Sequence, residues 1–217
     1  PAVAPSLVNE YPEVESVCRY MPGQYFEHLV AFGTQKNMLK TSYADPSLFD
    51  IFTIQFVYGN KGTPGDPNQI VLTQTTASRY FGNENPVGKI VRFNNNIDMT
   101  VSGVVKDLPH NTFLKFDAVV PLEIMKKTWE QENILDTWYN NSFATFGLLK
   151  SPDSFDKIAA GITKRIQKEM PESTNFLRAY QFKDGHLYVE KNIRNVKIFS
   201  LIGLLVLLAA TLNFINL

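Results

Sequence analysis

Residues 70–109 read IVLTQTTASRYFGNENPVGKIVRFNNNIDMTVSGVVKDLP, and this stretch decides the fold because strand and helix signals follow each other closely in it. The apolar run Ile70–Leu72 predicts a strand. Residues 74–81 predict a short helix directly after that strand. Gly82 follows at the usual place of a C-terminal cap, where a left-handed backbone is needed.

A β-hairpin is predicted next in the same stretch. Apolar and polar residues alternate over residues 97–105, which is typical of a strand with one buried face. Residues 89–93 form the partner strand, and Asn94-Asn95-Asn96 supplies residues that tolerate left-handed angles in the turn. Gly103 inside the second strand predicts a bulge or a close approach of another backbone.

Farther along the chain, a strand–helix–strand unit is predicted. Residues 143–149 are apolar enough for a buried strand, and Ser151-Pro152 supplies an N-cap and a first-turn proline. Residues 152–170 repeat apolar side chains at three-to-four spacing and predict a helix with one apolar face. With a further strand at residues 187–189, this helix would cover a sheet.

The N-terminal part of the chain is also rich in strand signals. Residues 6–11 predict a short helix, and strands are predicted near residues 14–20, 27–34 and 38–43. Residues 59–68, with three glycines and two prolines, predict a loop and a subdomain boundary. The predicted fold class is therefore α+β.

The C-terminal segment predicts a transmembrane helix. Residues 198–217 read IFSLIGLLVLLAATLNFINL, carry no charge and would span roughly 30 Å as a helix, which is the thickness of a hydrocarbon core. A buried central helix of a soluble protein is the alternative, but such helices are usually shorter or have a polar face. Asn213 and Asn216 share one helix face, and amides in a bilayer need partners on a neighbouring helix. The pattern favours a membrane protein with several helices.

The bulk composition excludes some function classes. Lys and Arg together number 21, as do Asp and Glu, so there is no net charge to attract nucleic acid. The single cysteine, Cys18, excludes an internal disulfide and does not settle the compartment.

Histidine spacing indicates no metal site. His28, His110 and His186 lie far apart, and no spacing places two of them on one helix face. Asp107, His110 and Asn111 fall close together, but their segment is interpreted as a solvated turn.

Nucleophile and nucleotide signals are equally weak. Cys18 precedes Arg19, which would lower its pKa, but a lone cysteine in a strand pattern is more often a small buried hydrophobe. Asn140-Asn141-Ser142 fits a glycosylation sequon, which is too common a pattern to carry weight. There is no nucleophile elbow, phosphate loop or nucleotide fingerprint. The sequence therefore predicts no catalytic, cofactor-binding or metal-binding residue, no cofactor and no enzyme.

Four strings of residues carry a family resemblance. They are Tyr43–Phe52, Val71–Lys89, Val101–Pro109 and Ala210–Leu217. In this order they resemble the MacB-type periplasmic domain and following membrane helix of FtsX-like ABC permeases, especially those of Bacteroidetes-type bacteria. Leu48 stands where an aromatic residue is usual in that family. The residues themselves indicate mainly structural roles, such as Asp45-Pro46 capping a short helix.

The resemblance implies a domain organisation. A porter-like α+β subdomain would combine residues 1–58 and 120–190, and a mainly β subdomain would be inserted at residues 59–119. Residues 196–217 would begin the second of four membrane helices. The domain between the first two helices would lie in the periplasm, with residues 1–190 outside the bacterial inner membrane.

Charge next to the predicted membrane helix does not alter this orientation. Lys191, Arg194 and Lys197 would place the preceding domain in the cytoplasm by the positive-inside rule. That rule applies to short loops, and long domains translocate largely regardless of charge.

The leading functional hypothesis is a non-catalytic domain that couples cytoplasmic ATP hydrolysis to export or mechanotransmission. The resemblance implies a cytoplasmic ABC ATPase, a second permease copy and the membrane as partners, with periplasmic adaptor or envelope proteins as further partners, and no nucleic acid. The alternative is the ligand-sensing extracytoplasmic domain of a membrane receptor. A membrane-anchored hydrolase is a third hypothesis, but it lacks a recognisable catalytic set.

Overall fold

The computed structural model describes residues 1–172, 179–185 and 192–215. Contacts divide the chain into two units, Pro1–Ser173 and Thr174–Leu217, which are described separately. The elements of the first unit are α1 (Val3–Glu10), β1 (Val14–Met21), the 3₁₀ turn η1 (Gly23–Tyr25), β2 (Glu27–Phe32), β3 (Gln35–Ala44), α2 (Ser47–Ile51), β4 (Phe56–Gly59), β5 (Gln69–Thr73), α3 (Gln74–Phe81), β6 (Ile90–Phe93), β7 (Ile97–Val105), β8 (Ala118–Pro121), α4 (Ile124–Thr128), β9 (Ala144–Leu149), the 3₁₀ turn η2 (Pro152–Ser154) and α5 (Phe155–Glu169). The second unit contains the 3₁₀ turn η3 (Phe182–Asp184) and the helix α6 (Asn192–Ile215).

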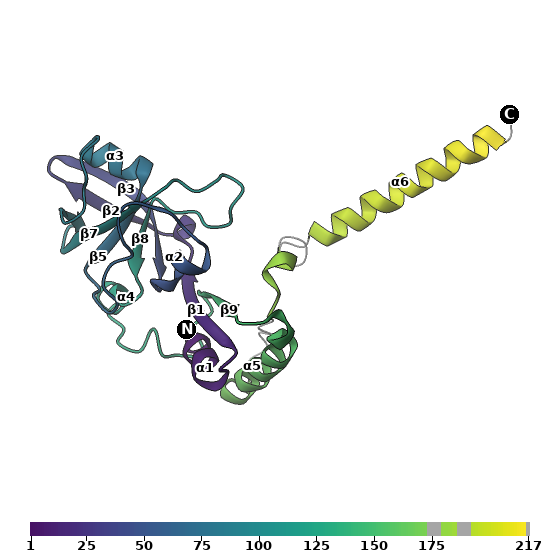
Figure 1. Cartoon of the computed structure of the whole chain (residues 1–217), viewed down its shortest axis with the longest axis horizontal. Coiled ribbons are helices and arrows are strands. Elements are labelled where there is room, and N and C mark those ends of the chain that lie inside the picture. Colours follow the sequence, from purple (N-terminus) through teal and green to yellow (C-terminus); the bar gives the residue numbers. More distant parts are fainter. Residues whose placement is uncertain (173–178, 186–191, 216–217) are drawn as a thin grey trace. The chain divides into compact units, whose positions relative to one another are not determined.

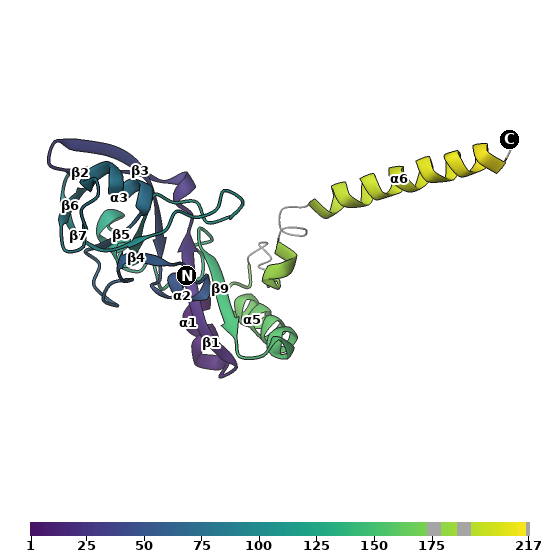
Figure 2. The same cartoon turned by 45° about the horizontal axis from the view of Figure 1, so that its top comes forward.

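Six strands of the first unit close into a barrel (Figures 1 and 2). Hydrogen-bonded neighbours follow the order β2, β6, β7, β5, β8 and β3, and β3 pairs again with β2. The β5–β7 and β3–β8 pairs are parallel and the other pairs in the ring are antiparallel. Closure leaves these six strands without a free long edge, which removes the usual site of unwanted strand pairing.

Alternating side chains place two cores on opposite faces of the barrel wall. Ile70 and Leu72 of β5 belong to the larger core, whereas Val71 between them belongs to the second core with α2. This is the period of two expected for a strand that is buried on both faces. The helix α3 is tied to the barrel by Tyr80, whose hydroxyl donates to the Val30 carbonyl at 2.8 Å.

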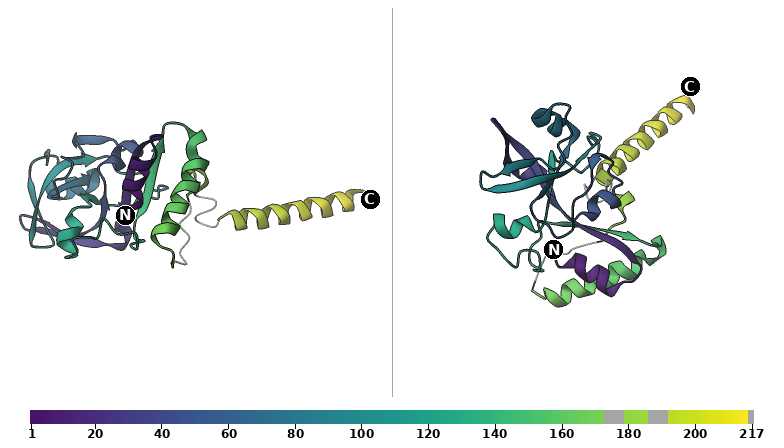
Figure 3. Two further views of the ribbon diagram at one scale, coloured as in Figure 1. Left: turned by 90° about the horizontal axis from the view of Figure 1, so that it is seen from below. Right: turned by 60° about the vertical axis from the view of Figure 1, so that its left-hand side comes forward.

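The strand β1 extends the barrel into an α/β layer (Figure 3). Its last residues, Tyr20 and Met21, pair with β3, while most of its length pairs with β9. Its two faces are covered by different helices. Val17 packs with the core of α1 and α5, and Cys18 packs with α2.

The helices α1 and α5 approach each other closely at one glycine. A Cβ atom on Gly161 of α5 would lie 1.9 Å from the Tyr11 hydroxyl oxygen, just after α1. The absence of a side chain at this position therefore lets the tyrosine ring lie against α5. The apolar face of α5 contributes Ile158, Ile162 and Ile166 to the same core.

The second unit contains a helix long enough to cross a membrane. By length and composition the candidate span is Ile193–Ile215, with a mean hydropathy of 2.5, and none of its most apolar window is buried. The helix begins upstream of residues 196–198, where the sequence predicts its start.

The structure confirms the predicted α+β class and most elements. The helix α3 has the predicted bounds, and Gly82 after it has a φ of 62°. In the predicted hairpin, Asn94 and Asn95 have φ values of 48° and 63°. Gly103 meets both expectations, because the β5–β7 register shifts beside it and a Cβ there would lie 2.5 Å from the Asn60 carbonyl oxygen.

Some predictions need correction or stay untested. The first helix begins at Val3, not at residue 6. The short elements β4, β8 and α4 were not predicted. The strand predicted at residues 187–189 lies outside the described residues, so the strand–helix–strand unit stays a prediction, as does the division into residues 1–58 with 120–190 and residues 59–119.

Candidate functional site

The described residues contain no group of three His, Cys, Asp or Glu side chains that could hold a metal ion. His28 lies in the barrel wall, where the Tyr43 hydroxyl is 2.7 Å from its Nε2 and the Asn94 amide nitrogen is 3.1 Å from its Nδ1. Burial lowers the pKa of His28 below its usual 6.5, although the hydrogen bond to Asn94 acts in the opposite direction. His110 is exposed in the loop after β7, and His186 lies outside the described residues.

Cys18 is a buried structural residue. Its side chain has no exposed surface, and burial together with the negative charge of Asp45 raises the pKa of its thiol to about 12. Arg19 acts to lower this pKa, as expected, but burial outweighs it, and the prediction that Cys18 is a small buried residue is confirmed. A thiol that stays protonated at neutral pH is a poor nucleophile.

Asp107 in the predicted polar loop has a structural partner. Its carboxylate accepts hydrogen bonds from the Thr75 amide at 3.0 Å and from the Thr75 hydroxyl at 2.8 Å. These bonds fasten the loop after β7 to the first turn of α3, where an acidic group is favourable. Asp107 and His110 therefore do not form a shared site.

An ion pair joins the barrel to the α/β layer. The guanidinium of Arg19 on β1 donates to both carboxylate oxygens of Asp45, at 2.9 Å from Nε and 2.8 Å from Nη2, and the Arg19 backbone amide donates to the same carboxylate at 2.8 Å. The Asp45 amide returns a bond to the Arg19 carbonyl at 3.1 Å. The predicted capping of α2 by the side chain of Asp45 is therefore wrong, because Arg19 takes up this carboxylate. We call these two residues the junction pair.

The junction pair borders a hollow of about 400 Å³. It is lined by Ala4, Pro5, Val17, Arg19, Asp45, Pro46, Ser47, Asp50, Lys61 and Pro64. Arg19 and Asp45 neutralise each other's charge at the wall of the hollow. The junction pair therefore offers a ligand no unpaired buried charge.

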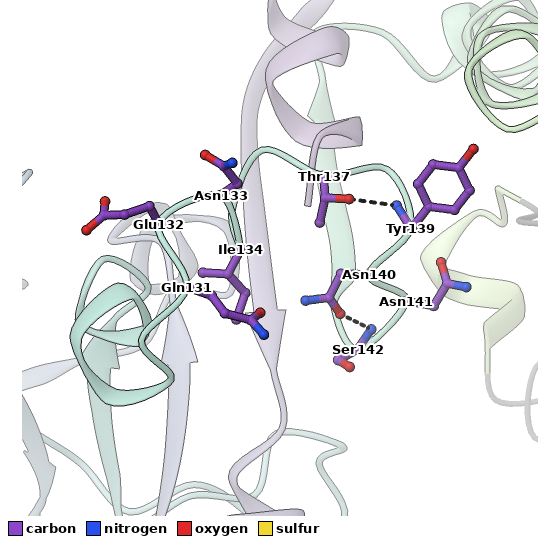
Figure 4. A pocket seen from close by; sticks show the side chains of 9 residues that line it. All are labelled: Gln131, Glu132, Asn133, Ile134, Thr137, Tyr139, Asn140, Asn141 and Ser142. Carbon is purple, nitrogen blue, oxygen red and sulfur yellow. Dashed lines mark hydrogen bonds between the residues drawn. The ribbon is translucent and has the colours of Figure 1, made fainter.

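A second hollow in the first unit is a surface cleft of about 650 Å³ (Figure 4). It lies in the segment between α4 and β9 and is lined by Gln131, Glu132, Asn133, Ile134, Thr137, Tyr139, Asn140, Asn141 and Ser142. We call it the amide cleft. Its lining is polar apart from Ile134, which is 3% exposed.

Local hydrogen bonds shape the amide cleft. The Tyr139 amide donates to the Thr137 hydroxyl at 3.2 Å, and the Ser142 amide donates to the Asn140 side chain at 3.1 Å (Figure 4). The Ala2 amide donates to the Thr137 carbonyl at 3.5 Å, which connects the segment to α1. Such side-chain-to-backbone bonds are typical of Asn and Thr in turns. The sequence did not predict this cleft, because a segment without periodicity gives no signal of a concave surface.

Comparison with solved structures defines the class of protein. The domain of a protein described as a permease from Porphyromonas gingivalis is 26% identical, with a TM-score of 0.61, over 76% of this chain and 70% of that chain. The periplasmic region of MacB from Actinobacillus actinomycetemcomitans is 19% identical, with a TM-score of 0.55, over 76% and 72% of the two chains. The extracellular domain of the ABC-type transporter YknZ from Gram-positive bacteria is 15% identical, with a TM-score of 0.58, over 77% and 82%. Because their identities to this chain are low, the MacB and YknZ structures show only that the fold is shared. The fold is that of an extracytoplasmic domain of ABC transporter permeases.

The chain belongs to the MacB-like periplasmic core domain family. The family model matches residues 1–165. This confirms the resemblance found in the sequence, and membership implies an ATPase partner and association with a membrane. No curated protein sequence matches the chain.

Proposed function

We propose that this domain couples ATP hydrolysis in the cytoplasm to export or mechanical signalling across the inner membrane. The observation that carries the proposal is a MacB-like domain followed in the same chain by a helix of membrane-spanning length. The domain would be non-catalytic, and its ATPase would be a separate subunit or domain. In the intact transporter we expect two permease copies, with periplasmic adaptor or envelope proteins as further partners.

The internal construction of the domain supports this role. Coupling requires a body in which displacement of one part moves the rest. The strand β1 pairs with β3 of the closed barrel and with β9 of the α/β layer, and the junction pair fixes β1 to the end of β3. Close-packed interiors of this kind transmit strain.

Reconstitution tests the coupling. The intact permease that contains this chain is purified with its ATPase, placed in vesicles and compared with a version in which a flexible linker replaces residues 1–190. We expect the linker version to assemble with the ATPase but to lose ATP-dependent substrate release. Unchanged release would refute the coupling. A permease that associates with no ATPase would instead favour the receptor hypothesis.

Cysteine labelling tests the location. Tyr25→Cys places a thiol at a position that is 73% exposed, whereas native Cys18 has no exposed surface. In intact spheroplasts, a membrane-impermeant maleimide should label the variant and not the parent protein. Labelling that requires membrane permeabilisation would place the domain in the cytoplasm and contradict the proposed periplasmic location.

A further inference from the structure

The lining of the amide cleft is rich in groups that both donate and accept hydrogen bonds. Gln131, Asn133, Asn140 and Asn141 contribute amides, and each amide has a carbonyl acceptor and an NH₂ donor. Within the part of the chain that the structure describes, the side chains of Gln131, Asn133 and Asn141 have no hydrogen-bond partner. These three amides are therefore available to a ligand.

The charge and polarity of the cleft exclude several ligand classes. Glu132 is the only charged residue in the lining, so no cation is present to hold a phosphate, a sulfate or a fatty-acid carboxylate. Ile134 is the only aliphatic residue and is almost fully buried, so an apolar ligand would find no matching surface. An uncharged ligand with many hydroxyl or amide groups fits the lining.

One aromatic ring narrows the class further. Tyr139 is 69% exposed and lies at the side of the cleft near Asn141, with its ring directed away from Gln131 and Asn133 (Figure 4). An exposed aromatic ring offers an apolar face, and a pyranose has a C–H face of similar size with hydroxyls around its rim. A peptide that binds as an added strand would need the edge of a sheet, and none of the nine lining residues belongs to a strand.

We propose that the amide cleft binds an uncharged glycan segment. One sugar ring stacks on Tyr139 beside the Asn141 amide, and the rings that follow bond to the amides of Gln131 and Asn133. The volume of about 650 Å³ lies within the range that holds a ligand of drug size, so a short oligosaccharide of two or three rings fits. In the periplasm such a ligand would tie the domain to a glycan of the cell envelope.

Titration with defined oligosaccharides tests the proposal. The full chain is kept in a detergent without a sugar headgroup, because a sugar detergent would compete for the cleft. Uncharged trimers of N-acetylglucosamine, glucose and mannose are added, and binding is followed by ¹H–¹⁵N NMR of the side-chain amides. We expect at least one trimer to bind with a Kd of about 1 mM and to shift the Gln131, Asn133 and Asn141 amide signals.

Matched variants locate the site. Tyr139→Ala should weaken binding about tenfold, and Asn141→Ala should weaken it about fivefold. Tyr25→Ala changes a tyrosine of similar exposure outside the cleft and should leave the Kd unchanged. All three positions are exposed, so the unfolding temperature should stay close to that of the parent chain.

Three results would overturn the proposal. The first is that no trimer binds at concentrations up to about 10 mM. The second is that binding survives Tyr139→Ala unchanged. The third is that none of the sugar trimers binds, whereas an uncharged peptide such as trialanine binds and loses affinity in Tyr139→Ala. That result would assign the cleft to peptides. None of these experiments involves an ATPase, so a negative result leaves the coupling proposal intact. Failure of the reconstitution experiment would likewise leave the glycan proposal intact.

Discussion

Removal of Asp45 tests how much the junction pair stabilises the domain. The Arg19 and Asp45 side chains are only 14% and 17% exposed. Asp45→Ala would leave the guanidinium largely buried and remove the three hydrogen bonds that Arg19 donates to the carboxylate. Two of these bonds come from the guanidinium and one from the backbone. Loss of one partner of a buried pair costs about 3–5 kcal/mol, and the remaining exposure places the expected cost near the lower end, at about 3 kcal/mol.

Urea unfolding of the full chain in detergent micelles measures this cost. With a urea slope of about 2 kcal/mol per M, a loss of 3 kcal/mol lowers the unfolding midpoint by about 1.5 M. The control is Asp50→Ala, which removes the acid of the exposed Asp50–Lys61 pair, whose side chains are 61% and 38% exposed. That variant should change stability by less than about 1 kcal/mol.

The two tryptophans report on the two sides of the junction. Trp129 packs against Phe26 at the barrel core, and Trp138 packs with the core of α1 and α5. Single-tryptophan versions of the chain should show the same midpoint shift for Asp45→Ala at both probes, because β1 pairs with a strand of each part. A shift no larger than that of Asp50→Ala would refute the reasoning. A shift at Trp138 alone would show that the barrel does not depend on the pair.

Three further results are expected. Gly161→Ala should lower the stability measured by thermal unfolding by about 1–2 kcal/mol, because the added Cβ overlaps the Tyr11 hydroxyl. In a Tyr11→Ala background the overlap is absent, and the same change should stabilise the helix. Destabilisation in that background would contradict the steric cause. Asp107→Ala should cost about 1 kcal/mol and speed hydrogen exchange in the first turn of α3, whereas unchanged exchange would show that the carboxylate does not hold that turn. Burial holds the pKa of His28 below 6.5, so the unfolded chain takes up this proton at a higher pH than the folded chain does. The contribution of His28 to the free energy of unfolding should therefore be highest above pH 6.5 and fall as the pH drops towards the folded-state pKa. His28→Gln should remove this part of the fall, and a pH profile equal to that of the parent chain would exclude His28 as its source.

Local patterns were sufficient to predict individual elements. The helix α3 and the β6–β7 hairpin follow from short-range rules of capping, alternation and turn chemistry, so their bounds and turn residues could be predicted. The membrane-length helix α6 follows from composition alone. The order of four short strings was then enough to indicate the family.

Long-range pairing and surface shape could not be predicted in the same way. Barrel closure depends on pairs such as Thr41 with Ala118, and a strand pattern does not identify its partner. The strands β4 and β8 have four residues each, too few for a clear alternation. Asp45 precedes a proline and resembles a cap, and only the fold shows that Arg19 binds it. The amide cleft comes from an irregular segment whose residues, taken singly, are typical of any loop.

The pairing of β1 with β9 also sets the order of events when the chain folds. Val14 pairs with Leu149, so the first strand waits for a segment made more than 100 residues later. At about 5–20 residues per second, synthesis of that interval takes roughly 10 s. Throughout this time one edge of β1 is open, and an open strand edge is prone to pair with other chains. A mutation that slows the docking of β9 would therefore appear first as aggregation or proteolysis of newly made protein, before the folded molecule showed any defect.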